Sequence, residues 1–310
     1  MKGPVIALTG ATGFIGRRLL RLLPAKGYRL RVLLRRPGEI PTEAASAAIG
    51  DLAAPHSLHE ALRGAEIVVH SAGLAHAMSG RPEDDFRLVN TEATLALARA
   101  AERVGVRRFV FLSSIRAQAG PSAAGVLTEA TPPAPTDAYG RSKLAAEEGL
   151  AGLTLDWVAL RPVLVYGEGV KGNMAALVCL ARSPLPLPLG GLQGRRSLLS
   201  VDNLVAAVEA VIGAPSPLRR PLIVADEDAL TVSEMVAALR SGLGRRPGLI
   251  PVPEAVLALA ARLAGREEAF QRLAGSLVAD PAALRSLGWA PPVASREGLA
   301  ALARSSAAGA

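Results

Sequence analysis

Short apolar runs alternate with longer amphipathic segments through the first half of the chain. Apolar runs bounded by glycine or polar residues are typical of strands, and apolar residues spaced three or four apart indicate helices. This pattern predicts strands at 4–10, 29–35, 65–73, 108–114 and 156–167, with helices at 14–27, 56–64, 84–105 and 139–150. Because the strand runs are apolar almost throughout, we expect a parallel sheet that is buried on both faces.

Strands that alternate with helices and are joined by right-handed crossovers form an α/β fold, a doubly wound parallel sheet of the Rossmann type. We therefore assign residues 1–166 to a dinucleotide-binding domain. After about position 167 the pattern loosens, and a Gly/Pro-rich segment at 183–197 interrupts it. Helices are predicted at 201–213, 231–242, 253–265 and 267–278, and a strand at 221–226. Residues 167–310 are expected to form mainly a smaller substrate-binding domain, with about 200–226 returning to the Rossmann sheet.

Composition narrows the classes of partner. The formal charge is +8, and aromatic residues make up 3% of the chain. The arginines occur as scattered pairs rather than as one stripe with stacking aromatics, which argues against nucleic-acid binding and leaves anionic small molecules as partners. No apolar run is long enough for a membrane span, so we expect none. The histidines lack the spacing of a zinc site, so we expect no bound metal.

One cysteine, Cys179, allows no internal disulfide and suits a reducing compartment. The apolar N-terminal stretch is interrupted by glycines, and Arg17 and Arg18 occupy the place of a cleavage region. This pattern does not fit a secretory signal, and we expect a cytoplasmic protein.

A glycine-rich turn joins the first predicted strand to the first helix. Gly10, Gly13 and Gly16 are spaced three apart there. Glycine lets the backbone approach a pyrophosphate, and the helix N-terminus supplies free N–H groups. The predicted cofactor contacts in this turn are Gly10, Thr12, Gly13, Phe14, Ile15 and Gly16.

The end of the second strand bears on cofactor choice. A carboxylate there would bind the adenosine ribose, whereas arginine accommodates a 2′-phosphate. The sequence has Leu34 at this position, followed by Arg35 and Arg36, which favours NADP over NAD. Solvated arginines beside bound NAD are the alternative. Asp51 and Leu52 are placed to touch the adenine.

Tyr139 and Lys143 form a rare pair, because the chain has only three tyrosines and has lysine only at 2, 26, 143 and 171. Positions four apart share one face of a helix. An ammonium close to a phenol lowers the pKa of the phenol. The spacing therefore predicts a tyrosine with a lowered pKa that acts as a general acid or base, the alternative being an exposed helix face.

Several ordered motifs together resemble the extended short-chain dehydrogenases/reductases, and more closely the NAD-dependent epimerase/dehydratase group. The motifs are TGATGFIG (9–16), GDL (50–52), HSAG (70–73), LSS (112–114), YGRSK (139–143) and LRPVLVYG (160–167). Residues 172–204 resemble those of bacterial UDP-hexose 4-epimerases and UDP-4-keto-sugar reductases.

The resemblance implies roles for individual residues. Ser114, Tyr139 and Lys143 correspond to the catalytic residues, with Tyr139 taking the proton of a sugar hydroxyl as a hydride leaves for the nicotinamide. It further implies cofactor contacts by Ser71, Ala72, Gly73, Asn90, Tyr139, Lys143 and Arg161, and substrate contacts by Ser114, Gln118, Tyr139, Asn173 and Arg196.

The resemblance implies a UDP-hexose 4-epimerase of surface polysaccharide synthesis. The alternative is an NADPH-dependent UDP-4-keto-sugar reductase, and a non-catalytic NADP-binding module is a third possibility that the intact Ser114, Tyr139 and Lys143 oppose. Ile115 and Arg116 stand where the family's dehydratases carry Asp-Glu, so dehydration is not expected. A homodimer through the helices at 84–104 and 139–150 is expected from the same resemblance.

Overall fold

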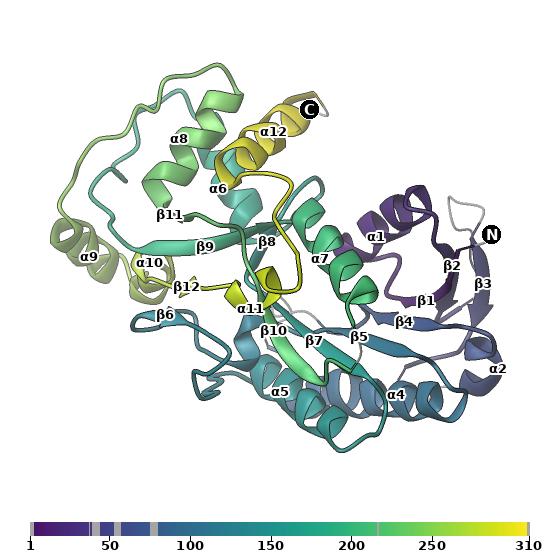
Figure 1. Ribbon diagram of the computed structural model, residues 1–310. Coiled ribbons are helices and arrows are strands. Elements are labelled where there is room, and N and C mark those ends of the chain that lie inside the picture. The colour runs from purple at the N-terminus through teal and green to yellow at the C-terminus, as the bar shows by residue number, and fades with distance from the viewer. Residues whose placement is uncertain are drawn as a thin grey trace.

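The computed structural model describes residues 3–36, 38, 44–52, 57–74, 80–215 and 217–308 (Figure 1). Its centre is a seven-stranded sheet in which neighbouring strands run parallel. The strand order is β10 (Arg220–Val224), β7 (Trp157–Pro162), β5 (Arg108–Leu112), β4 (Ile67–His70), β1 (Val5–Thr9), β2 (Arg29–Leu34) and β3 (Ala45–Ala48). The predicted α/β doubly wound fold is confirmed.

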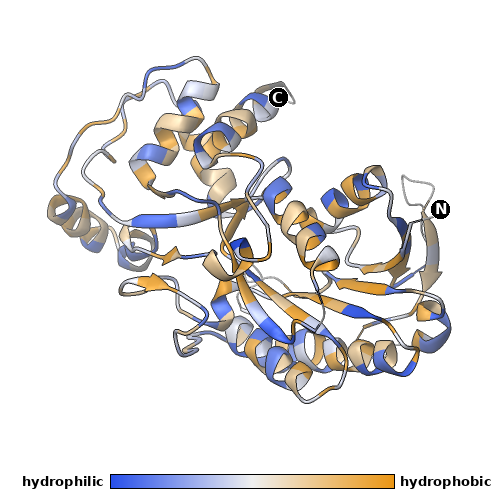
Figure 2. Cartoon of the chain, in the orientation of Figure 1, coloured by the Kyte–Doolittle hydropathy of each residue, from blue (hydrophilic) through white to orange (hydrophobic). Residues whose placement is uncertain are grey.

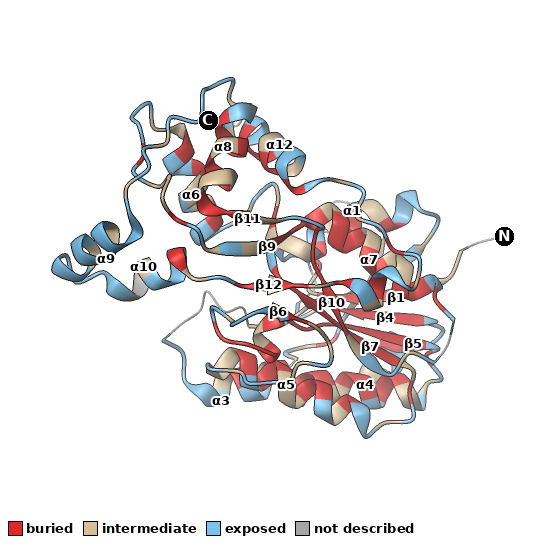
Figure 3. Ribbon diagram, turned by 60° about the vertical axis from the view of Figure 1, so that its left-hand side comes forward, coloured by how far each residue is buried: buried red, intermediate tan, exposed pale blue. Residues whose placement is uncertain are grey.

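Helices cover both faces of this sheet, which explains the continuous apolar strands (Figures 1 and 2). One face carries α1 (Phe14–Ala25) and α7 (Val201–Gly213), and the other carries α2 (Leu58–Leu62), α4 (Ala93–Arg103) and α5 (Ala138–Ala151). All five residues of β5 are buried, as are all four of β4 (Figure 3). The hydrophobic effect thus stabilises two cores, one on each side of the sheet.

A second layer of structure lies at the carboxyl ends of the central strands. It holds a small sheet of β11 (Ala229–Thr231), β9 (Arg195–Ser200) and β8 (Leu164–Tyr166). Helices α6 (Asn173–Arg182), α8 (Val232–Gly242) and α12 (Ser295–Ala308) share one apolar core with this sheet. The remaining elements are β6 (Val126–Leu127) paired with β12 (Val278–Ala279), α9 (Glu254–Leu263), α10 (Glu267–Ala274) and α11 (Ala282–Arg285).

Three predicted elements divide differently in the structure. The strand predicted at 156–167 is two strands in different sheets: β7 pairs with β5 and β10, and β8 pairs with β9. The helix predicted at 84–105 is α3 (Glu83–Phe86), a π-helix (Arg87–Glu92) and α4 in succession. The helix predicted at 267–278 ends at Ala274, and β12 follows it.

Candidate active site

The glycine turn after β1 forms a cradle at the start of α1. Gly10 has φ of 71°, and a Cβ there would lie 2.6 Å from the amide nitrogen of Ala72. A side chain at Gly10 would therefore close the gap between the β1 and β4 loops. Thr12 and Gly13 are exposed, Phe14 and Ile15 are half-buried and Gly16 is buried. No side chain caps the α1 N-terminus, so its N–H groups are available to a pyrophosphate, and the cradle fits a dinucleotide.

Exposed polar residues lie at the end of β2, beside this cradle. β2 ends at Leu34, and the Arg35 and Arg36 that follow are exposed. The Arg35 guanidinium lies 3.9 Å from the Asp51 carboxylate, and Leu52 is half-buried. An exposed pair at that distance binds weakly, so the arginine remains able to meet a phosphate.

A buried histidine that the sequence did not single out joins the strand ends under the cradle. His70 Nδ1 lies 2.7 Å from Thr9 Oγ1, and Nε2 lies 2.9 Å from Thr94 Oγ1. Because the Thr94 hydroxyl donates its proton to the Asn90 carbonyl, it accepts from Nε2–H of a neutral imidazole. Burial and the nearby Lys143 lower the pKa of His70 to about 3. Thr9 in turn accepts from the Ala72 amide, so the histidine fixes the loop that faces Gly10.

Asn90 lies in the π-helix, completely buried. Its side chain accepts from the Leu74 amide at 2.8 Å and donates to the Ser142 hydroxyl at 3.1 Å. It therefore fixes the loop after β4 against α5. A Cβ at Gly73 would lie 2.7 Å from Asn90 Oδ1 and 3.4 Å from Lys143 Nζ, so this loop runs directly over the lysine. Ser71 and Ala72, two residues and one residue before Gly73, are half-buried.

Ser114, Tyr139 and Lys143 meet at the carboxyl end of β5. Ser114 lies close enough to Tyr139 for its hydroxyl to lower the pKa of the phenol. Lys143, one turn further along α5, is buried and donates to the Leu112 carbonyl at 2.9 Å. Its ammonium also lies 4.5 Å from the centre of the Phe111 ring, a cation–π contact. A phenol, a hydroxyl and an ammonium thus converge where parallel sheets bind ligands.

The predicted lowering of the Tyr139 pKa is wrong for the chain as described. Burial raises the pKa of Tyr139 and the Asp137 carboxylate adds to this, whereas the Ser114 hydrogen bond and Arg116 lower it. Burial is the main physical reason for the difference, and the Lys143 ammonium donates to the Leu112 carbonyl instead of the phenol. Burial also lowers the pKa of Lys143 to about 8, against the opposing effect of the Glu147 carboxylate.

Glu147 and Arg161 form a buried ion pair behind Lys143. Each side chain is 4% exposed, and Arg161 Nε lies 3.1 Å from both carboxylate oxygens. Ser113 donates to the same carboxylate. The Arg161 guanidinium is thus engaged with Glu147, and its predicted cofactor contact stays a prediction.

Three further predicted substrate residues are Gln118, Arg196 and Asn173. The side-chain amide of Gln118 donates hydrogen bonds to the carbonyl oxygens of Thr128 and Thr131, at 2.6 and 2.8 Å. Arg196, at the start of β9, is half-buried, and burial and the nearby Arg116 lower its pKa. Asn173 is exposed at the first position of α6. Their contacts with substrate stay predictions.

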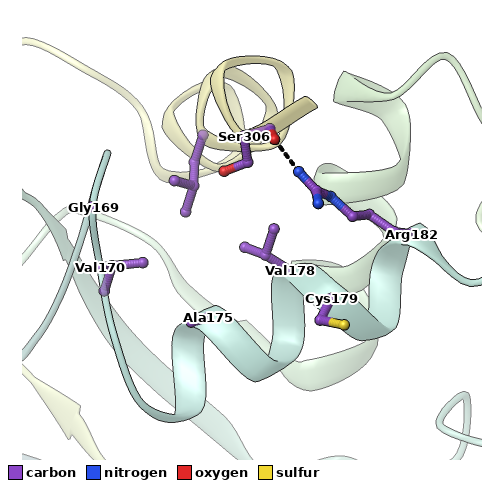
Figure 4. A pocket seen from close by; sticks show the side chains of 8 residues that line it. Gly169, Val170, Ala175, Val178, Cys179, Arg182 and Ser306 are labelled. Carbon is purple, nitrogen blue, oxygen red and sulfur yellow. Dashed lines mark hydrogen bonds between the residues drawn. The ribbon is translucent and has the colours of Figure 1, made fainter. Parts of the chain in front are cut away.

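A separate pocket of about 190 Å³ lies between α6 and α12 (Figure 4). Val178 and Cys179 of α6 line it, and Arg182 closes one end by donating to the Ser306 carbonyl. None of the predicted site residues lines this pocket.

None of the helices built from the described residues is long and apolar enough to cross a membrane.

Comparison with known proteins agrees with this geometry. The model of the NAD dependent epimerase/dehydratase family matches residues 6–224. The chain belongs to the NAD dependent epimerase/dehydratase family. A UDP-glucose 4-epimerase from Vibrio cholerae is 34% identical over 304 residues, which cover 94% of this chain and 92% of the relative.

Other similar proteins differ in name. A ceramide reductase from Caulobacter vibrioides is 32% identical over 253 residues, 81% of this chain and 74% of that protein. Among solved structures, MoeE5 in complex with UDP-glucuronic acid and NAD superposes with a TM-score of 0.76, at 28% identity and over 99% of this chain and 100% of that one. The relatives of this chain therefore include an epimerase and a reductase.

Proposed function

We propose that this chain is an NAD(P)-dependent 4-epimerase that acts on a UDP-hexose. The observation that carries the proposal is that Ser114, Tyr139 and the buried Lys143 meet at the carboxyl end of β5, beside the dinucleotide cradle at Gly10. The similarity to the V. cholerae UDP-glucose 4-epimerase and to MoeE5, which binds UDP-glucuronic acid and NAD, supports a UDP-linked substrate.

The residues divide the chemistry between them. When bound, the nicotinamide supplies hydride transfer to and from the sugar carbon. Tyr139 takes the proton of the C4 hydroxyl and gives it back to the same oxygen once the 4-keto sugar has turned over and hydride has returned to the opposite face of C4. Ser114 hydrogen-bonds that oxygen. Lys143 keeps a positive charge beside the site, and Arg196 would pair with the diphosphate.

Ile115 and Arg116 argue against a dehydratase. Ile115 is 4% exposed and apolar, and Arg116 is ion-paired with Asp137. Neither residue can move protons at C5 and C6 as a carboxylate pair would. The reaction therefore stops at oxidation and reduction of one carbon.

The second candidate is an NADPH-dependent reductase of a UDP-4-keto sugar. Arg35 and Arg36 favour it, because both are exposed at the end of β2, where a 2′-phosphate would lie. For the same reason we propose NADP ahead of NAD as the cofactor. Serine at both positions would then weaken NADPH binding at least tenfold and leave NADH binding nearly unchanged.

We further propose that the enzyme acts in the cytoplasm, in the synthesis of surface polysaccharide, and forms a homodimer through the helical segments at 84–104 and 139–150. Cys179, a free and exposed thiol, suits a reducing compartment. Size-exclusion chromatography with light scattering would test the dimer, and a monomer at micromolar concentration would contradict it.

One incubation separates the functions. Purified protein is mixed with UDP-glucose or UDP-N-acetylglucosamine without added cofactor, and C4 epimers are followed by NMR. Epimers support the first proposal. NADPH oxidation that needs a 4-keto sugar supports the reductase instead. An absence of activity in both assays supports a non-catalytic NADP-binding module. Acid release of bound nucleotide identifies NAD or NADP in the same preparation.

A further inference from the structure

An ion pair couples the two segments that carry Ser114 and Tyr139. Arg116 follows Ser114 by two residues, and its guanidinium is bonded to the Asp137 carboxylate, two residues before Tyr139. The two side chains are 14% and 28% exposed, so solvent screens the pair only partly. This pair and the catalytic pair thus join the same two segments.

Each partner is also fixed within its own segment. Ser114 caps the short 3₁₀-helix Ile115–Ala117 by accepting from the Arg116 amide at 3.1 Å. Asp137 caps α5 by accepting from the Gly140 amide at 2.7 Å through its other carboxylate oxygen. The Asp137 carboxylate therefore caps the helix that carries Tyr139 and also binds Arg116 in the turn that follows Ser114.

The backbone of α5 at Gly140 also lies against the backbone of the turn that follows Ser114. A Cβ at Gly140 would lie 2.2 Å from the carbonyl oxygen of Arg116, inside any allowed contact. Gly140 has no alternative role as a left-handed residue, since it lies in the first turn of α5. Glycine here permits the contact that the ion pair holds closed.

We propose that Arg116 and Asp137 are positioning residues that hold Ser114 against Tyr139. This inference rests on the proposed function for its kinetic consequence. Displacement of a catalytic group by about 1 Å costs on the order of 100-fold in rate, so loss of the pair should lower kcat and leave KM nearly unchanged.

The two charges also act on Tyr139 in opposite directions. Asp137 raises the pKa of Tyr139 and Arg116 lowers it. The other nearby charges are Lys143, which donates to Leu112, and Arg196, which is close enough to Arg116 for its own pKa to be affected. Removing Arg116 should therefore raise the pKa of Tyr139, and neutralising Asp137 should lower it.

The test compares Arg116→Ala, Arg116→Lys and Asp137→Asn. Asparagine keeps the α5 cap, so this variant removes the charge with little loss of helix. Arg141→Ala is the matched control, because Arg141 lies on the same helix in an exposed pair with Glu83. We expect kcat to fall about 10- to 100-fold in Arg116→Ala and Asp137→Asn, with partial recovery in Arg116→Lys and no change in Arg141→Ala.

Tyrosine titration provides a readout independent of catalysis. Protein labelled with ¹³Cζ-tyrosine is titrated by NMR, and Tyr139→Phe identifies the Tyr139 signal among three. Opposite pKa shifts in Arg116→Ala and Asp137→Asn support the proposal, even if neither epimerase nor reductase activity is found. Shifts in one direction, no shift, or an active Arg116→Ala with unchanged kcat would overturn it.

Discussion

The Lys143 ammonium lies 2.9 Å from the carbonyl oxygen of Leu112, at the end of β5, and not on the phenol of Tyr139. The lysine is thereby tied to the strand that leads into Ser113 and Ser114. Its charge is set by the buried Glu147 one turn further along α5, because this carboxylate opposes the lowering of the Lys143 pKa by burial.

Glu147→Gln should lower the pKa of Lys143 below its value of about 8, because the negative charge that opposes the effect of burial is then removed. NMR of ¹³Cε-lysine would follow this, since the chain has few lysines. Glu148→Gln, at the exposed neighbouring position, is the control and should leave the pKa unchanged. Equal shifts in both variants would contradict the assignment.

Tyr139→Phe should lower the epimerase rate by about 10³-fold or more, because the phenyl ring retains the packing against Phe86 but cannot accept a proton. Bound cofactor should remain in the same amount. Tyr28→Phe is the control, since Tyr28 lies in the loop between α1 and β2. A Tyr139→Phe protein that keeps most of its rate would exclude the proposed role.

His70 should make stability depend on pH below neutrality. The pKa of His70 falls from 6.5 to about 3 on folding. Between these two pH values the imidazole is protonated in the unfolded chain and neutral in the folded chain. The contribution is complete above pH 6.5 and is lost as the pH falls towards 3. Between pH 7 and pH 5 it amounts to about 2 kcal/mol of unfolding free energy.

Urea unfolding of His70→Gln at both pH values measures this contribution. The decrease in unfolding free energy between pH 7 and pH 5 should be about 2 kcal/mol smaller than in the parent protein. His59→Gln, which changes an exposed histidine, should show the parent's dependence. An unaltered pH dependence in His70→Gln would mean that His70 is protonated in the folded state.

Asp226 should be critical for stability. It is 2% exposed and accepts from Asn203 at 2.7 Å, from Ser295 at 3.1 Å and from the buried Tyr166 at 3.3 Å. Asp226→Asn replaces one acceptor oxygen by a donor and should lower the unfolding free energy by about 2–3 kcal/mol. Asp228→Asn, two residues away and exposed, should change it by less than about 0.5 kcal/mol. Similar losses in both would refute a special role for Asp226.

The local pattern of apolar and polar residues was sufficient to predict most strands of the central sheet. The strands β1, β2, β4, β5 and β7 were predicted because each is an apolar run between helical patterns. By contrast, β3 reads ASAA, and β9 reads RRSLLS, with two charged residues at its start. Neither carries a strand signal of its own, and both exist because neighbouring strands supply hydrogen-bond partners.

The sequence by itself determined the doubly wound sheet, the glycine cradle and the Ser114–Tyr139–Lys143 set, because these depend on short patterns and spacing. Only the tertiary structure decided the electrostatics. It placed Lys143 on Leu112, buried His70 between two threonines, and joined Arg116 to Asp137 across 21 residues. Desolvation and charge pairing depend on which segments meet in space, and this explains why the pKa of Tyr139 moved opposite to the prediction from spacing.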